Sequence, residues 1–104
     1  MNKPRVPDSR DLKELFQAVL ALGGERECAE FFSDLCTPAE LLDMADRWKA
    51  ARLLEQGLPY REIYEKTGVS TATVTRVARA LFQGRGGYRK ALERRKSKRS
   101  PARD

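Results

Sequence analysis

The stretch from Tyr60 to Phe82, YREIYEKTGVSTATVTRVARALF, constrains the fold most because it predicts two short helices joined by a tight turn. Gly68 suits the positive backbone φ that a turn between packed helices requires. Ser70 can cap the second helix by accepting a hydrogen bond from an N–H group of its first turn. The apolar residues of that helix recur at i, i+3, i+4 and i+7 and share one face, namely Val74, Val77, Ala78 and Leu81. The stretch therefore predicts a helix-turn-helix.

The opposite face of the second predicted helix is small, hydroxylated and cationic, and it contains no carboxylate. Its residues are Thr71, Ala72, Thr73, Thr75, Arg76 and Arg79. A helix that enters the DNA major groove needs such a face, because it must approach a polyanion closely and hydrogen-bond phosphates or base edges. The alternative is an amphipathic surface hairpin with a chance excess of threonine.

We predict a DNA-binding surface on this unit. The three threonines and Arg76 would lie near base edges or phosphates, and Ala72 would allow close approach to a thymine methyl group. Tyr60, Arg61 and Arg79 would contact the phosphate backbone. The full predicted set is Tyr60, Arg61, Ser70, Thr71, Ala72, Thr73, Thr75, Arg76 and Arg79.

Charge is distributed unevenly along the chain. Residues 1–57 contain 8 Lys and Arg against 11 Asp and Glu, a net charge of −3. Residues 58–104 contain 13 against 4, a net charge of +9, and the two parts sum to the total of +6. The cationic excess coincides with the predicted helix-turn-helix and the residues after it, which indicates a nucleic-acid-facing end and an assembly end. A generic basic tail accounts for part of this excess.

Two strongly apolar helices are predicted before the centre of the chain. The first is capped by Asp8 or Ser9 and ends at Gly23-Gly24, and the second covers residues 25–35. Neither contains residues of catalytic chemistry, so their apolar faces belong to a core or a dimer interface rather than a ligand pocket. These apolar positions are too many for one small core, which favours an oligomer.

Thr37-Pro38-Ala39-Glu40 is a strong start for a third, central helix. Thr37 is the cap, Pro38 supplies the preset φ of the first position, and Glu40 completes a capping box. The helix is predicted to run to Gln56 and to stop at Gly57. Its apolar residues cover more than one face, so it should contact several other helices.

These segments divide the chain into four expected parts. Residues 1–7 form a flexible leader, residues 8–57 a helical core and dimerisation region, and residues 58–83 the helix-turn-helix unit. Residues 84–104 form a basic, glycine-containing tail that is partly disordered, with a weak helix over 89–98 that frays from about Lys96. The tail either lies along phosphates or only keeps the protein soluble, and both readings stay open.

Several classes of protein are disfavoured. No run of about 18 apolar residues is present, so no membrane span is expected, and the N-terminal residues lack a signal-peptide core, which favours the cytoplasm. Cys28 and Cys36 occur in a chain without histidine, so we expect buried free thiols and no metal site. An enzyme is the least supported class, because no histidine, phosphate-binding glycine loop or nucleophile–base pairing is available.

Three segments resemble the Trp repressor family, and more closely its YerC/YecD branch. They are LCTPAELLDMADRWKAARLLEQG, YREIYEKTGVSTATVTRVARAL and the GRGGY that follows, and the resemblance covers about residues 10–90. It implies an all-α, Trp repressor-like helical bundle that forms an intertwined homodimer in a bacterial cytoplasm, associated with the nucleoid. The two recognition helices would enter successive major grooves about 34 Å apart on a near-palindromic site.

The resemblance also implies a possible ligand pocket. In tryptophan-sensing members the amino acid is held by two arginines, and Arg47 and Arg76 stand at the matching positions. Val77 replaces a glycine that leaves room for the indole, and Ala80 replaces a serine that receives the amino group, a loss of roughly 1–3 kcal/mol. We therefore expect no tryptophan corepressor and no other cofactor. Tyr64 stands where a small residue is commoner, so it would change the interhelical angle or turn outward toward phosphate.

The resulting hypothesis is a sequence-specific DNA-binding transcriptional regulator, with repression as the expected mode, that acts as a homodimer on double-stranded DNA. Two alternatives remain. One is an architectural DNA binder with little sequence preference, driven by the basic tail, and the other is a helical protein-interaction module.

Overall fold

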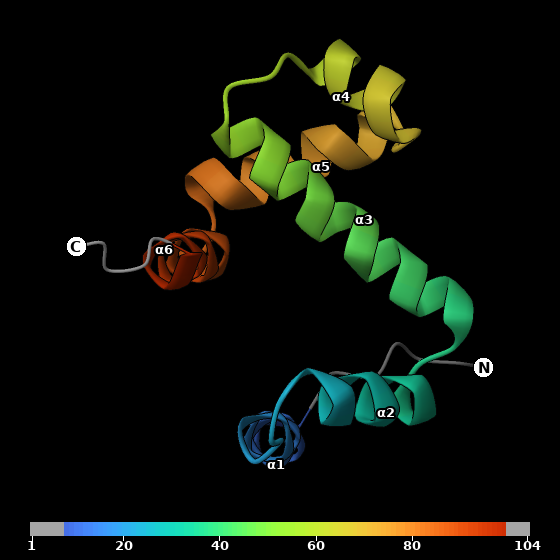
Figure 1. Cartoon of the computed structure of the whole chain (residues 1–104), viewed down its shortest axis with the longest axis vertical. Helices are drawn as coiled ribbons and strands as arrows, with labels where there is room; N and C mark the ends of the chain where they lie inside the picture. The colour runs from blue at the N-terminus through green and yellow to red at the C-terminus, as the bar shows by residue number, and fades with distance from the viewer. Residues whose placement is uncertain (1–7, 100–104) are drawn as a thin grey trace. The chain divides into compact units, whose positions relative to one another are not determined.

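The computed structural model describes residues 8–99, and within this range the chain is entirely α-helical (Figure 1). The all-α prediction is therefore confirmed. The expected leader over residues 1–7 and the end of the tail, residues 100–104, lie outside the described range. The helices are α1 (Ser9–Leu20), α2 (Glu25–Leu35), α3 (Pro38–Glu55), α4 (Tyr60–Thr67), α5 (Thr71–Gln83) and α6 (Gly87–Arg99).

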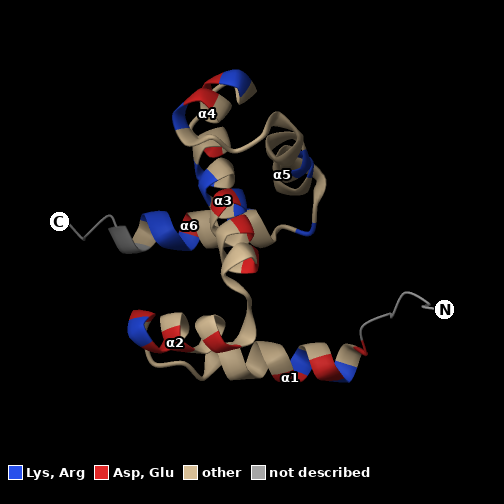
Figure 2. Cartoon of the chain, turned by 90° about the vertical axis from the view of Figure 1, so that its right-hand side faces the viewer, with Lys and Arg blue, Asp and Glu red and all other residues tan. Residues whose placement is uncertain are grey.

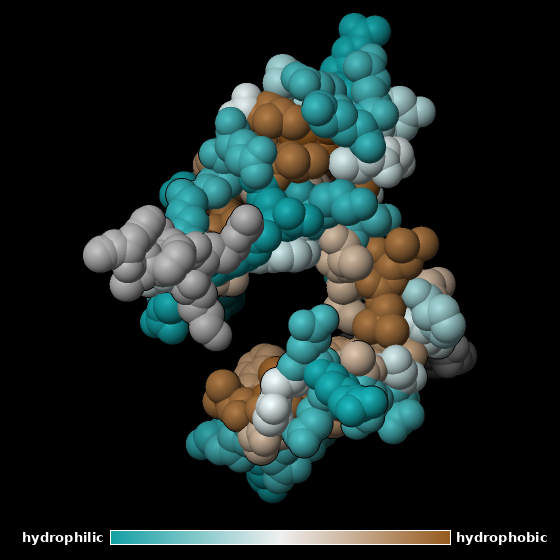
Figure 3. Space-filling model, viewed as in Figure 1, coloured by the Kyte–Doolittle hydropathy of each residue, from teal (hydrophilic) through white to brown (hydrophobic). Residues whose placement is uncertain are grey.

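The chain divides into two compact units, Met1–Leu41 and Leu42–Asp104. In the first unit, the Asp8 side chain caps α1 by accepting from the N–H of Arg10 at 2.8 Å. Neither α1 nor α2 buries a single residue within this chain. Phe16 and Leu20, one turn apart on α1, are 58% and 82% exposed, and Figure 3 shows hydrophobic residues, in brown, at the surface of this unit. The apolar stripe of α1 thus finds no cover inside one chain.

The start of α3 is built as the sequence predicts. The backbone N–H of Thr37 donates to Glu40 Oε1 at 2.8 Å, and the N–H of Glu40 donates to Thr37 Oγ1 at 3.1 Å. This reciprocal pair is a capping box, with Pro38 at the first helical position. The helix ends at Glu55, one residue earlier than expected, and Gly57 follows with a φ of 90°.

The second unit contains the hydrophobic core, to which α3, α4, α5 and α6 all contribute. Ile63, Val74 and Val77 are its largest fully buried side chains. Burying each of them stabilises the fold by roughly 1.5–3 kcal/mol. The whole cluster is Ala50, Ala51, Leu54, Ile63, Val69, Val74, Val77, Ala78, Leu81 and Leu92. All four residues predicted for the inner face of α5 are in it.

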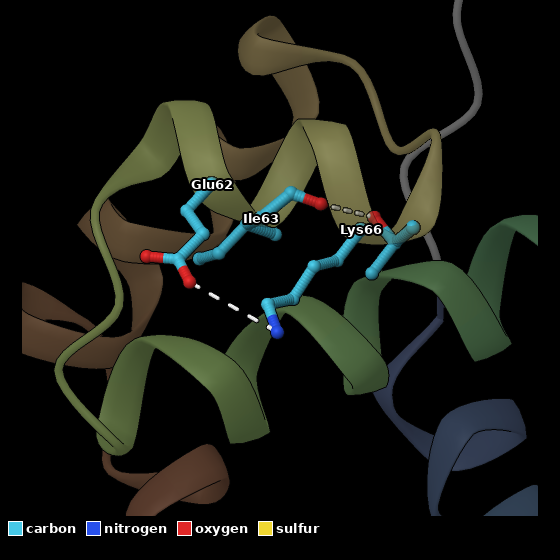
Figure 4. A network of polar contacts seen from close by, with 4 residues as sticks. Glu62, Ile63 and Lys66 are labelled. Atoms are coloured by element: carbon cyan, nitrogen blue, oxygen red, sulfur yellow. Dashed lines mark hydrogen bonds and ion pairs between the residues drawn. The ribbon is translucent and has the colours of Figure 1, made fainter.

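The turn between α4 and α5 is held by local hydrogen bonds. Gly68 adopts a φ of 79°, the left-handed conformation that ends α4. Thr67 Oγ1 donates to the carbonyl of Ile63 at 2.7 Å and accepts from the N–H of Val69 at 3.0 Å. Figure 4 shows Ile63 in α4 beside an ion pair between Lys66 and Glu62, whose Nζ and Oε2 atoms lie 3.9 Å apart. The predicted helix-turn-helix is present.

The tail departs from expectation because α6 is longer than the predicted weak helix and packs against α3 and α5 within the second unit. It begins at Gly87 and continues to Arg99, past Lys96, where fraying was expected. Leu92 is 3% exposed, and Tyr88, one turn earlier, stacks on Trp48 with ring centroids 6.3 Å apart. Lys96 Nζ also lies 2.6 Å from Glu55 Oε2 of α3. Two apolar anchors and one ion pair therefore hold this basic helix in place.

Candidate nucleic-acid interface

The exposed face of α5 exists because the opposite face is buried. Val74 and Val77 are 0% and 1% exposed, and they fix the rotation of α5 about its own axis. The remaining side of the helix faces solvent. Of the nine residues predicted to bind DNA, Thr73 is half-buried and the other eight are exposed, namely Tyr60, Arg61, Ser70, Thr71, Ala72, Thr75, Arg76 and Arg79.

The N-terminus of α5 is capped without any acidic residue. Ser70 Oγ accepts from the N–H of Thr73 at 3.1 Å, and its hydroxyl also lies 3.0 Å from Thr73 Oγ1. No Asp or Glu occurs in the first turn, so the positive end of the helix dipole is not neutralised there. In Figure 2, α5 carries blue cationic residues and no red ones, whereas α4 carries both. This end of α5 is suited to an anion.

The arginines of this surface are available to a ligand. Within residues 8–97, no carboxylate lies within ion-pairing distance of Arg76 or Arg79. Arg61 Nε lies 3.6 Å from Glu65 Oε2, but the two side chains are 86% and 63% exposed. Such a solvated pair contributes only about 0–1 kcal/mol, so a phosphate can replace it at little cost.

Residues from α4 and α5 meet on one surface. Tyr60, Thr75 and Arg79 line a shallow cavity of about 220 Å³ together with Ala78, Phe82 and Gln83. The fold thus brings together side chains that are separated by the turn in the sequence. Phe82, which is exposed, was not included in the predicted set, although it follows Arg79 at helical i+3 spacing.

Tyr64 is 50% exposed and lies one turn after Tyr60 on α4. From the sequence, Tyr64 is expected either to change the angle between the two helices or to turn outward. The structure shows its side chain exposed to solvent. Its i+4 relation to Tyr60 is the sequence signal that could have added it to the predicted surface.

A second cavity, of about 320 Å³, is lined by residues of α3 and of the start of α5. It contains both arginines of the predicted ligand pocket, Arg47 and Arg76. Asp43 and Asp46 also line it and were not in the predicted pocket, although Asp43 precedes Arg47 at i, i+4 spacing, which places these two side chains on one side of α3. Val77 is buried in the core and is not among the lining residues, which are Asp43, Asp46, Arg47, Gly68, Val69, Ser70, Thr73 and Arg76.

Between residues 8 and 99, no three His, Cys, Asp or Glu residues gather as a potential metal-binding group. Cys28 and Cys36 are free thiols, but they are half-buried rather than buried as expected, because α2 has no fully covered face in one chain. No helix of the described range is long and apolar enough to cross a membrane.

Comparison with known proteins shows that the chain is similar to one family over most of its length, and not only in the helix-turn-helix. The sequence model of the family described as Trp repressor protein matches residues 10–96. The uncharacterized protein YerC of Bacillus subtilis (strain 168) is 44% identical over 85 residues, which cover 82% of either chain.

Two solved structures share the fold. A TrpR-like protein from Eubacterium eligens ATCC 27750 superposes with a TM-score of 0.79 at 42% identity, covering 82% of this chain and 88% of that one. A candidate Trp repressor from Staphylococcus aureus gives a TM-score of 0.79 at 41% identity, covering 83% and 86%. The likeness therefore extends over most of the chain.

Proposed function

The chain belongs to the Trp repressor protein family, and from this premise we propose that it is a homodimeric, sequence-specific DNA-binding transcriptional regulator that acts as a repressor. The observation that carries the proposal is the exposed, carboxylate-free face of α5, held outward by the buried Val74 and Val77. The proposal is one of binding rather than catalysis, in the cytoplasm and associated with the nucleoid.

In this proposal, the N-terminal half of α5 enters the major groove. Thr71, Thr75 and Arg76, together with Thr73, contact base edges or phosphates, and the small Ala72 lets the helix approach the groove closely. Tyr60, Arg61 and Arg79 contact the phosphate backbone and fix the orientation of the unit. Ser70 contributes through the cap that orders the first turn.

The second subunit covers the apolar face of the N-terminal region. Phe16 and Leu20 would each gain about 1–2.5 kcal/mol from burial of their exposed parts, and Leu12 and Leu35 are exposed as well. A two-fold dimer uses the same patch on both copies and presents two recognition helices to a near-palindromic site. Residues 8–57 are thus proposed as the dimerisation region, residues 58–83 as the DNA-binding unit and residues 84–104 as the basic tail.

We predict that this regulator does not bind L-tryptophan. Asp43 and Asp46 balance the charges of Arg47 and Arg76 in this cavity, so no net positive charge is left for the carboxylate of an entering amino acid. Apart from Gly68 and Val69 the lining is charged or hydroxylated, so it offers the indole ring little apolar contact. Isothermal titration of the purified protein with L-tryptophan should give no binding heat. Micromolar binding would contradict the prediction.

Selection of bound sequences from a random duplex pool tests the proposed function. We expect a two-fold symmetric consensus that is bound about 10³ times or more tightly than random duplex at physiological salt. An affinity ratio near unity would favour the alternative, a non-specific architectural DNA binder, for which the basic α6 is the supporting feature. Absence of any DNA binding would favour a helical protein-interaction module.

A further inference from the structure

The outward side of α6 is a cationic face that the helix-turn-helix does not include. Lys90 and Arg94 are both exposed and are separated by one helical turn. At 3.6 residues per turn, each lies roughly 160° around the helix from the buried Leu92, on the side away from the core. We call these two residues the α6 cationic face. In the sequence, Lys98 continues the same i+4 spacing.

Two other cations of α6, Arg89 and Lys96, have partners, whereas this face has no ion-pairing partner within residues 8–97. Lys96 pairs with Glu55 at 2.6 Å, and the guanidinium of Arg89 lies 5.8 Å from the centre of the Phe82 ring. Within residues 8–97, no carboxylate lies within ion-pairing distance of Lys90 or Arg94. These two charges are therefore free to meet an external anion.

The face is also held in a fixed place. Leu92 is inserted into the core, and Tyr88 stacks on Trp48 of α3. A cation on a docked helix loses less conformational freedom on binding than one on a flexible chain. A tail that only increased solubility would not need these anchors.

We propose that the α6 cationic face binds the phosphate backbone of duplex DNA outside the bases that α5 contacts. This inference rests on the proposed function, since it assigns a second contact to the same partner. Duplex DNA offers a dense row of charges, about one per 1.7 Å of its axis, which a row of helical cations can follow. Leu92 is in the core and Tyr88 packs against it, so Ala91 is the largest apolar side chain that α6 exposes within residues 87–97, which is too small to anchor in a membrane or to stack on RNA bases.

The test replaces both cations in the full chain, as Lys90→Gln with Arg94→Gln. Binding to a random-sequence duplex is measured by fluorescence anisotropy over a series of salt concentrations. Losing two phosphate contacts should reduce the slope of log affinity against log salt by about 1.8 for each bound protomer, and weaken binding roughly ten- to thirtyfold at 0.15 M salt. The thermal unfolding midpoint should not change, because both side chains are exposed.

A matched variant controls for net charge. Arg10→Gln with Lys13→Gln removes the same two charges from exposed positions on α1, and we expect it to keep the wild-type salt slope. If the α6 variant behaves like this control, the α6 cationic face does not contact DNA and the inference is wrong. The inference is equally wrong if the α6 variant binds DNA normally but loses attachment to vesicles that contain anionic lipid.

A third variant separates this inference from the proposed function. Thr75→Ala with Arg76→Ala removes contacts of the proposed recognition helix and leaves α6 untouched. If only the α6 variant weakens DNA binding, the α6 contact stands and the role proposed for α5 fails. If the wild-type protein binds no duplex at any salt concentration, both fail.

Discussion

A glutamate in place of Ala72 will lower the affinity for duplex DNA by at least about a hundredfold while leaving the fold intact. Ala72 is exposed and is the second residue of α5. A carboxylate near a helix N-terminus stabilises the helix by about 0.3–1 kcal/mol through the helix dipole. Against a phosphate the same charge costs several kcal/mol, and about 3 kcal/mol is already more than a hundredfold in affinity. Stability and DNA binding should therefore change in opposite directions.

Anisotropy titrations and thermal unfolding of the same sample measure the two effects of Ala72→Glu. The matched control is Ala80→Glu, the same substitution at another exposed position of α5 that is outside the predicted set. The two positions differ by about 12 Å of helical rise, which exceeds the screening length of about 8 Å at physiological salt. We expect the control to bind DNA within about fivefold of wild type. Equal losses for both variants would show that α5 responds only to net charge.

Aspartates at Phe16 and Leu20 together will dissociate the proposed dimer. These side chains are 58% and 82% exposed in the single chain, and no residue of α1 is buried there. Scaled by these exposed fractions, the four side chains of a dimer contribute about 4–8 kcal/mol, at roughly 1.5–3 kcal/mol for a fully exposed side chain. Losing that burial raises the dimer dissociation constant by about 10³-fold or more. DNA affinity falls with it, because linked recognition helices bind far more tightly than single ones.

Sedimentation equilibrium measures this change directly. Gln17→Asp is the control, since it places an aspartate at an exposed polar position of the same helix. The control should remain dimeric and should bind DNA as wild type does. If the Phe16→Asp, Leu20→Asp protein stays dimeric, the dimer interface lies elsewhere. If the wild-type protein is monomeric, the proposed dimer does not exist.

The parts of the fold that depend on near neighbours were predictable from the sequence. The capping box of α3 and the Ser70 cap of α5 join residues three apart, so the pattern of residue types specifies them. The inner face of α5 follows from helical periodicity, and Val74 and Val77 are buried as the spacing predicts. The exposure of the predicted DNA-binding residues follows from the same rotation of the helix.

Contacts between residues distant in the sequence were not predictable in the same way. A weak helix was expected over residues 89–98, but Tyr88 stacks on Trp48, some forty residues earlier in the sequence, and anchors α6. Asp43 and Asp46 of α3 lie in one cavity with Arg76 of α5, and this depends on contacts between helices that no local pattern specifies. The apolar pattern of α1 could not show whether its apolar face is buried in the core of one chain or in a dimer interface, because either environment buries one face of a helix.

The first turns of α5 are proposed to contact duplex DNA, and chemical-shift mapping can locate that contact residue by residue. Isotope-labelled wild-type protein is titrated with the selected duplex, and the backbone amide resonances are followed. We predict that the largest shifts occur between Ser70 and Arg76 and that they reverse when the salt concentration is raised. Unchanged α5 amides in a sample whose other resonances show saturable DNA binding would contradict the claim.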